Sequence, residues 1–137
     1  MVKLAFDTNV IVDLLRGRNR VVRRRFVEAC ESEQGLAVSL IVWLELLYGC
    51  ERSLDPDFER ASVQELLEPI SIEALDEGDI VHAARMRAYL HKMGRPIGPY
   101  DLLIAGQALA RDWTLVTANT REFSRIEGLK VIDWSTP

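Results

Sequence analysis

The sequence of 137 residues has little cysteine and no long apolar run. Cys30 and Cys50 lack the spacing of a metal site or redox pair, so we expect both to be reduced and packed. There is no apolar segment of about 20 residues, the length that a membrane helix needs. The first residues also lack the charged and long apolar regions of a signal peptide. These absences predict a cytoplasmic protein with no membrane partner.

Motifs of several common enzyme classes are absent as well. There is no Gly-rich phosphate loop, no Gly-x-Ser-x-Gly turn and no cysteine nucleophile with a matched histidine. His82 and His91 are nine residues apart, a spacing that does not form a metal pair on one helix face. The sequence therefore contains no other catalytic motif that competes with a metal site built from acidic residues.

The charge is acidic overall but contains one basic stretch. The net charge is -4, yet residues 16–25 hold six arginines and no acid, so the rest of the chain carries -10. A basic patch that begins at Arg16 and lies beside an acidic metal site would suit a phosphodiester substrate. Alternatively, these arginines form a solvated helix face.

Apolar patterning predicts strands and helices that alternate along the whole chain. Strands are expected near 3–6, 36–38, 70–72, 114–117 and 129–132, and helices over 10–16, 21–31, 40–50, 57–68, 77–93 and 101–111. Strands separated by helices imply a mainly parallel sheet of four to five strands with helices on both faces. We therefore expect a single α/β domain over residues 1–137.

Asp7 follows the first predicted strand directly and precedes Thr8 and Asn9. It should therefore lie at the carboxyl edge of the sheet, where ligands bind in open α/β folds. Alternatively, Asp7 makes only an Asx turn, and Thr8 or Asn9 only caps the next helix.

Two further acids border apolar segments. Glu45 lies in the apolar segment 40–48, where a buried carboxylate must be paired, protonated or bound to a cation. The alternative is that Glu45 points outward, beside Arg52 or another helix. Asp101 follows Gly98-Pro99-Tyr100, and there the alternative is a simple helix N-cap.

Small polar residues flank two of the predicted strands. Ser39 is expected to cap the helix that starts at residue 40. Thr117 and Asn119 follow the strand at 114–117, where they could hydrogen-bond a metal-bound water or only shape the turn. If Asp7, Glu45 and Asp101 converge, their repulsion would raise their pKa values unless a divalent cation neutralised them. Carboxylates suit Mg²⁺ or Mn²⁺, and such a site can hydrolyse a phosphodiester.

Four sequence blocks, at 4–9, 39–49, 98–106 and 117–123, together resemble the PIN-domain family, and within it the VapC toxins of bacterial toxin-antitoxin pairs. The resemblance implies a Mg²⁺- or Mn²⁺-dependent ribonuclease in which Asp7, Glu45 and Asp101 hold the metal and a metal-bound water attacks the RNA phosphate. It also implies a homodimer inhibited by a VapB-type antitoxin, with promoter DNA bound only through the antitoxin. The substrate it suggests is a tRNA anticodon loop, and the motifs Gly-Pro-Tyr-Asp at 98–101 and Thr-Arg-Glu-Phe at 120–123 resemble those of members that cut initiator tRNA.

One position departs from the family pattern. Many PIN domains have a fourth acid where this chain has Asn119, with Glu122 three residues further on. Asn119 can orient a water but carries no charge, which favours one metal ion over two. A non-catalytic binding or regulatory module, in which the acids bind Mg²⁺ or only cap helices, is the alternative from another class.

Overall fold

The computed structural model describes residues 3–137, which form five strands and seven helices. In chain order these are β1 (Lys3–Phe6), α1 (Thr8–Arg16), α2 (Arg20–Glu31), β2 (Gly35–Ser39), α3 (Leu40–Glu51), α4 (Pro56–Leu66), β3 (Ser71–Glu73), α5 (Glu77–Lys92), α6 (Pro99–Ala110), β4 (Thr114–Val116), α7 (Thr120–Phe123) and β5 (Lys130–Ile132). None of the helices within 3–137 is long and apolar enough to cross a membrane.

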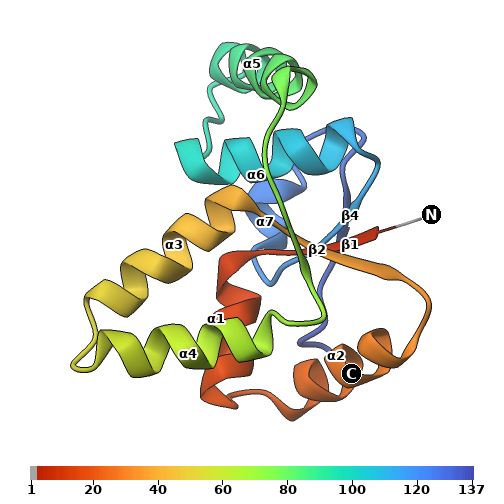
Figure 1. The fold of residues 1–137 in the computed structure, drawn as a ribbon. Helices are drawn as coiled ribbons and strands as arrows, with labels where there is room; N and C mark the ends of the chain where they lie inside the picture. The colour runs from red at the N-terminus through yellow and green to blue at the C-terminus, as the bar shows by residue number, and fades with distance from the viewer. Residues whose placement is uncertain (1–2) are drawn as a thin grey trace.

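The five strands form one parallel sheet in the order β3-β2-β1-β4-β5. On the central strand, Ala5 is in register with Ala37 of β2 on one side and with Leu115 of β4 on the other. Helices α1, α2 and α4 lie on one side of this sheet and α5 and α6 on the other (Figure 1). The expected parallel sheet with helices on both faces is confirmed.

The strand order reverses direction at β1. The chain moves from β1 outward through β2 to β3, and then returns to the other side of β1 for β4 and β5. In parallel sheets, such a reversal leaves a crevice at the carboxyl ends of the two strands where it occurs. The segments that follow β1 and β4 therefore meet at one place.

The core is continuous across the centre of the sheet. Phe6 is fully buried and packs edge-on against the rings of Phe26, at 5.7 Å between centroids, and Trp134, at 5.3 Å. On the other face, α5 and α6 approach so closely that a Cβ added to Gly106 would lie 2.8 Å from the Cβ of Ala83. A side chain at Gly106 would hold these two helices apart.

All the predicted elements are present, but several boundaries differ. Helix α1 begins at Thr8 rather than at 10, since the Asp7 side chain accepts a hydrogen bond from the Thr8 backbone N–H. Helix α6 begins at Pro99 rather than at Asp101, because proline suits the first turn, where no backbone N–H is needed. The short helix α7 was not predicted, since four residues are too few to show helical periodicity.

One expectation about burial is wrong. Cys50 is buried as expected, but Cys30 is exposed, because it lies on the outer face of α2. On α5, Ala83, Met86 and Leu90 are buried, whereas Ile80 and Met93 are exposed.

Candidate active site

Asp7 is buried at the carboxyl end of β1 and is held by both neighbouring elements. Its Oδ1 accepts from the Thr8 backbone N–H at 2.8 Å, and its Oδ2 accepts from the Thr117 hydroxyl at 2.8 Å. Its own N–H donates to the carbonyl of Val116 on β4 at 3.0 Å. The cap of α1 is thus Asp7 itself, and the alternative that Thr8 or Asn9 caps this helix is wrong.

Burial raises the pKa of Asp7 above its ordinary value. The hydrogen bonds from Thr117 and Thr8 oppose this change, and the negative charge of Glu122 adds to it. Desolvation therefore favours the protonated form of Asp7, and the two hydrogen-bond donors favour its ionised form.

Thr117 and Asn119 form a short chain of hydrogen bonds that ends at Asp7. The Thr117 hydroxyl is fully buried and accepts from the Asn119 backbone N–H at 3.0 Å while it donates to Asp7. The Asn119 side-chain amide donates to Glu122 Oε2 at 3.1 Å. Thr117 shapes the turn and also orients Asp7, and a hydrogen bond from Thr117 or Asn119 to a metal-bound water stays a prediction.

Glu45 lies half-buried in the middle of α3 and faces α1. The Thr8 hydroxyl donates to Glu45 Oε1 at 2.6 Å, which connects the first turn of α1 to α3. The alternative that Glu45 points outward beside Arg52 is wrong, since the Arg52 guanidinium lies over the Tyr48 ring, 5.6 Å from its centroid.

Asp101 is in the first turn of α6 and is not its N-cap. The cap position belongs to Gly98, and no side chain within 3–137 caps this helix by a hydrogen bond. Burial raises the pKa of Asp101 from 3.8 to about 6, and the charges of Asp7, Glu45 and Glu122 add to this rise in that order. Three acids from β1, α3 and α6 thus lie close enough to repel one another, together with Glu122 from α7.

These acids fit a divalent cation in charge and donor type. Hard carboxylate oxygens are the ligands that Mg²⁺ and Mn²⁺ prefer, and a cation would relieve the repulsion that raises the pKa of Asp101. Over the described part of the chain, however, no three Asp, Glu, His or Cys side chains form a cluster that could hold an ion as they lie. The charge and the donor atoms of these acids therefore suit a divalent cation, but the side chains do not surround an ion in this arrangement.

Three other predicted residues lie beside or away from these acids. Ser39 is buried and caps α3 by accepting from the Ile41 N–H at 3.1 Å, as expected. Asn9 is exposed on α1. Arg16 lies at the opposite end of α1 from Asp7, exposed, with its guanidinium 3.6 Å from Glu59. Binding roles for Asn9 and Arg16 stay predictions.

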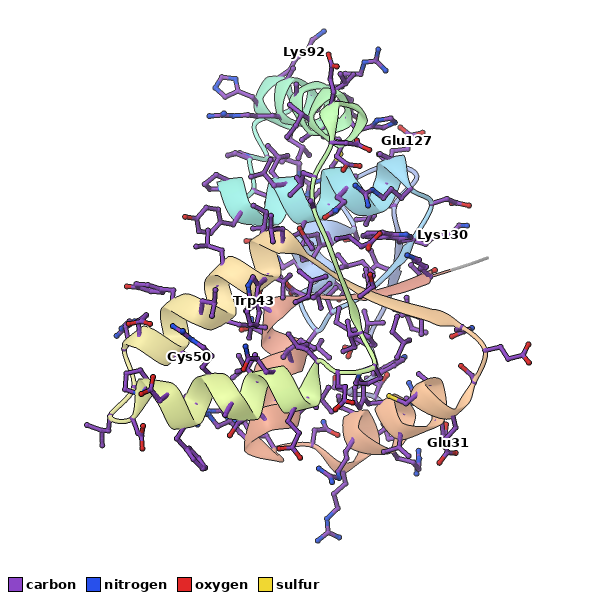
Figure 2. All side chains as sticks on the ribbon, viewed as in Figure 1. Glu31, Trp43, Cys50, Lys92, Glu127 and Lys130 are labelled. Carbon is purple, nitrogen blue, oxygen red and sulfur yellow. The ribbon has the colours of Figure 1, made fainter. Side chains whose placement is uncertain are left out.

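The basic stretch is mainly a solvated surface. Arg20, Arg23 and Arg24 are exposed on α2, and Arg24 pairs with Glu28 at 3.9 Å. Other charged side chains also point outward; Lys92 on α5 and Glu31 on α2 mark opposite ends of the molecule (Figure 2). This observation favours the solvated helix face considered for residues 16–25.

Sequence reasoning missed two aromatic residues beside the acids. Tyr48 and Tyr100 line a groove of about 370 Å³ together with Thr8, Leu44 and Glu45. A signal was present, since Tyr48 lies one helical turn after Glu45 and Tyr100 directly precedes Asp101. The local pattern alone assigns Tyr48 to a helix and Tyr100 to a turn.

An acidic cluster at the carboxyl edge of a parallel sheet, beside the point where the strand order reverses, defines an α/β protein with an acid-based site. The PIN domain profile matches residues 4–129. The chain belongs to the PIN domain family, in its VapC branch.

Relatives and solved structures agree with this assignment. The chain is 37% identical over 136 residues to the tRNA(fMet)-specific endonuclease VapC of Shigella flexneri, covering 98% of this chain and 100% of that protein. It is 32% identical over 129 residues to ribonuclease VapC1 of Haemophilus influenzae, covering 94% and 96%. The DNA-bound VapBC structure from Salmonella typhimurium matches with a TM-score of 0.90 and 35% identity, covering 98% and 99%. VapBC-1 from nontypeable Haemophilus influenzae matches with a TM-score of 0.88 and 31% identity, covering 99% and 100%.

Proposed function

We propose that this chain is the toxin of a type II toxin-antitoxin pair and an endoribonuclease that acts in the cytoplasm on a tRNA anticodon loop, that of the initiator tRNA. The observation that carries the proposal is the meeting of Asp7, Glu45 and Asp101 at one edge of the sheet. The similarity to tRNA(fMet)-specific endonucleases supports the choice of RNA. A non-catalytic binding module is disfavoured, because the relatives above are named as endonucleases and ribonucleases.

The cofactor proposed is Mg²⁺ or Mn²⁺, held by Asp7, Glu45 and Asp101. When bound, such an ion supplies positive charge at the scissile phosphate and makes water more acidic. The protein's own residues do the positioning: Thr117 orients Asp7, and Thr8 orients Glu45. Asp101, with its pKa near neutrality, is the acid whose ionisation a cation would favour most.

Asn119 and Glu122 complete this proposed site. Asn119 carries no charge but holds the Glu122 carboxylate, and the charge of Glu122 acts on both Asp7 and Asp101. We assign Asn119 a supporting role in orienting water and this carboxylate, which is smaller than the role of the three acids.

The proposed partners are a VapB-type antitoxin and a second copy of the chain, with promoter DNA bound through the antitoxin. Matching structures include VapBC complexes bound to DNA, which supports an antitoxin and DNA as partners. Exposed apolar side chains on α3 and α5 offer surface for protein contacts; they are Leu40, Ile80 and Val81.

The test is incubation of the purified chain, free of antitoxin, with total tRNA in Mg²⁺ or in a chelator. We expect discrete fragments only with Mg²⁺. Asp7→Asn and Asp101→Asn should abolish cleavage while the far-UV circular dichroism spectrum is unchanged, and Asn119→Ala should only weaken it. Equal activity in all three variants, or equal cleavage in the chelator, would refute the proposal.

A further inference from the structure

The groove beside the acids has an unusual lining. Its residues are Thr8, Leu44, Glu45, Tyr48 and Tyr100, so it is bounded by two aromatic rings and one leucine and reaches the acids at Glu45. Tyr48 is 61% exposed and Tyr100 is 48% exposed, although large apolar rings are costly to leave in water. The groove is lined from three helices, by Thr8 of α1, by Leu44, Glu45 and Tyr48 of α3, and by Tyr100 in the first turn of α6.

We propose that this groove holds one unpaired base of the RNA next to the scissile phosphate, stacked on Tyr48 and Tyr100. This inference rests on the proposed function and names a substrate subsite within it. Tyr48 and Tyr100 act as positioning residues, which place the backbone of the bound strand over Asp7, Glu45 and Asp101.

The chemistry of the lining selects a base over other parts of the strand. The rings of Tyr48 and Tyr100 and the Leu44 side chain offer no positive charge to a phosphate, whereas they suit the flat, uncharged face of a base. Each base has a π-face that stacks on tyrosine, which is how proteins commonly hold single-stranded RNA. A volume of about 370 Å³ also falls in the range of roughly 300–1,000 Å³ found for small-ligand sites.

A cation beside Tyr48, one of the residues that line the groove, suits the adjoining phosphate. The Arg52 guanidinium lies over the Tyr48 ring, and no ion pair found among residues 3–137 involves it. A base on Tyr48 would therefore bring its flanking phosphate toward a positive charge. In this arrangement Arg52 faces the flanking phosphate, the two tyrosines hold the base, and Glu45 lies at the cleavage site.

The other hollows lack this connection to the acids. One of about 180 Å³ is lined by α5 residues and by Ile126 and Glu127, and another of about 550 Å³ lies between α2 and the end of the chain. Neither includes Asp7, Glu45 or Asp101 in its lining. Tyr89, on the first of these hollows, is 51% exposed and serves as a matched control.

The experiment measures cleavage of a hairpin RNA with the susceptible loop, and of a set of copies that each lack one loop base. The proteins are the wild type and the Tyr48→Leu, Tyr100→Leu, Tyr48→Phe, Tyr100→Phe and Tyr89→Leu variants, each checked for an unchanged thermal unfolding midpoint. Loss of one stack should raise KM about fivefold or more with kcat nearly unchanged. The Phe variants and Tyr89→Leu should behave like the wild type.

The abasic RNAs separate stacking from a structural role. One abasic position should raise KM for the wild type by about the same factor as the Leu substitution, and it should have no further effect in the Leu variants, because the partner ring is already absent. Effects that simply multiply at every position would overturn the inference.

Two more outcomes would show whether the groove binds RNA and whether the proposed function holds. If the Leu variants keep wild-type kinetics on RNA but escape inhibition by the antitoxin, the groove holds a protein side chain and not a base. If the wild type cleaves no RNA with Mg²⁺, the proposed function fails, and this inference fails with it. Active wild type with unaffected Leu variants refutes the inference alone.

Discussion

Asp101→Asn should stabilise the metal-free protein at neutral pH while it removes cleavage. The carboxylate of Asp101 is destabilised by burial and by three negative neighbours, which is why its pKa is raised to about 6. The asparagine amide has nearly the same shape but no charge, so it does not carry this penalty. A residue that lowers stability but is needed for activity is expected where function requires strained electrostatics.

The size of the effect follows from the pKa difference. A rise from 3.8 to about 6 corresponds to about 3 kcal/mol at most, and solvent at this half-buried site reduces the figure to about 1–3 kcal/mol. For a domain of this size, each kcal/mol is about 4 °C in Tm.

The pH dependence gives the sign. Because the folded-state pKa lies above the unfolded value, the protonated Asp101 favours folding below about pH 3.8, and this contribution is lost as the pH rises through about 6. The Tm advantage of the Asn variant should therefore be largest near about pH 8 and small near about pH 4.

Thermal unfolding in a chelator at these two pH values measures the effect, with Asp57→Asn, an exposed residue in the first turn of α4, as a control. Added Mg²⁺ should then raise the Tm of the wild type more than that of the variant, because binding to the folded state stabilises it. A variant that is less stable than the wild type near about pH 8, or a difference that does not change with pH, would refute the reasoning.

Three further changes test one contact of the site and two contacts between α5 and α6. Thr117→Val removes the hydrogen bond to Asp7 Oδ2 and should cost about 1–3 kcal/mol in urea unfolding and shift the pH–rate profile upward, whereas Thr117→Ser should retain both properties. Gly106→Ala should cost about 1–3 kcal/mol because its Cβ meets Ala83, and adding Ala83→Gly should restore part of this, as denaturant midpoints will show. Arg111→Leu leaves the Asp79 carboxylate, 1% exposed, without its guanidinium and should cost about 3–5 kcal/mol; Asp79→Asn in the same chain should reduce the loss.

The sequence was sufficient to find the acids because each interrupts an apolar segment. Glu45 is conspicuous in the segment 40–48, and Asp7 comes directly after an apolar strand. Local pattern also predicted the alternation of strands and helices, since both periods are visible over a few residues. These features depend only on neighbours along the chain.

What the sequence could not provide is the set of contacts across the chain. Strand order is decided by packing between segments far apart, so the position of β1 between β2 and β4 was not visible locally. The bond from Thr8 to Glu45 spans 37 residues, and the one from Thr117 to Asp7 spans 110. The alternative that Asp101 only caps its helix is excluded by the start of that helix at Pro99, two residues earlier, which the local sequence did not reveal.

The position of Asp7 explains why the acids meet at this place. Because β1 is central, its carboxyl end is flanked by the end of β2, which leads into α3 and Glu45, and by the end of β4, which leads to Thr117 and Asn119. Helix α6 precedes β4 and brings Asp101 to the same edge, where its charge is coupled to that of Asp7. A strand order with β1 at the edge of the sheet would leave Asp7 with only one neighbouring strand. The acidic site is therefore a consequence of the topology as much as of the residues, and a substitution that moves β1 should disturb the whole cluster rather than one member.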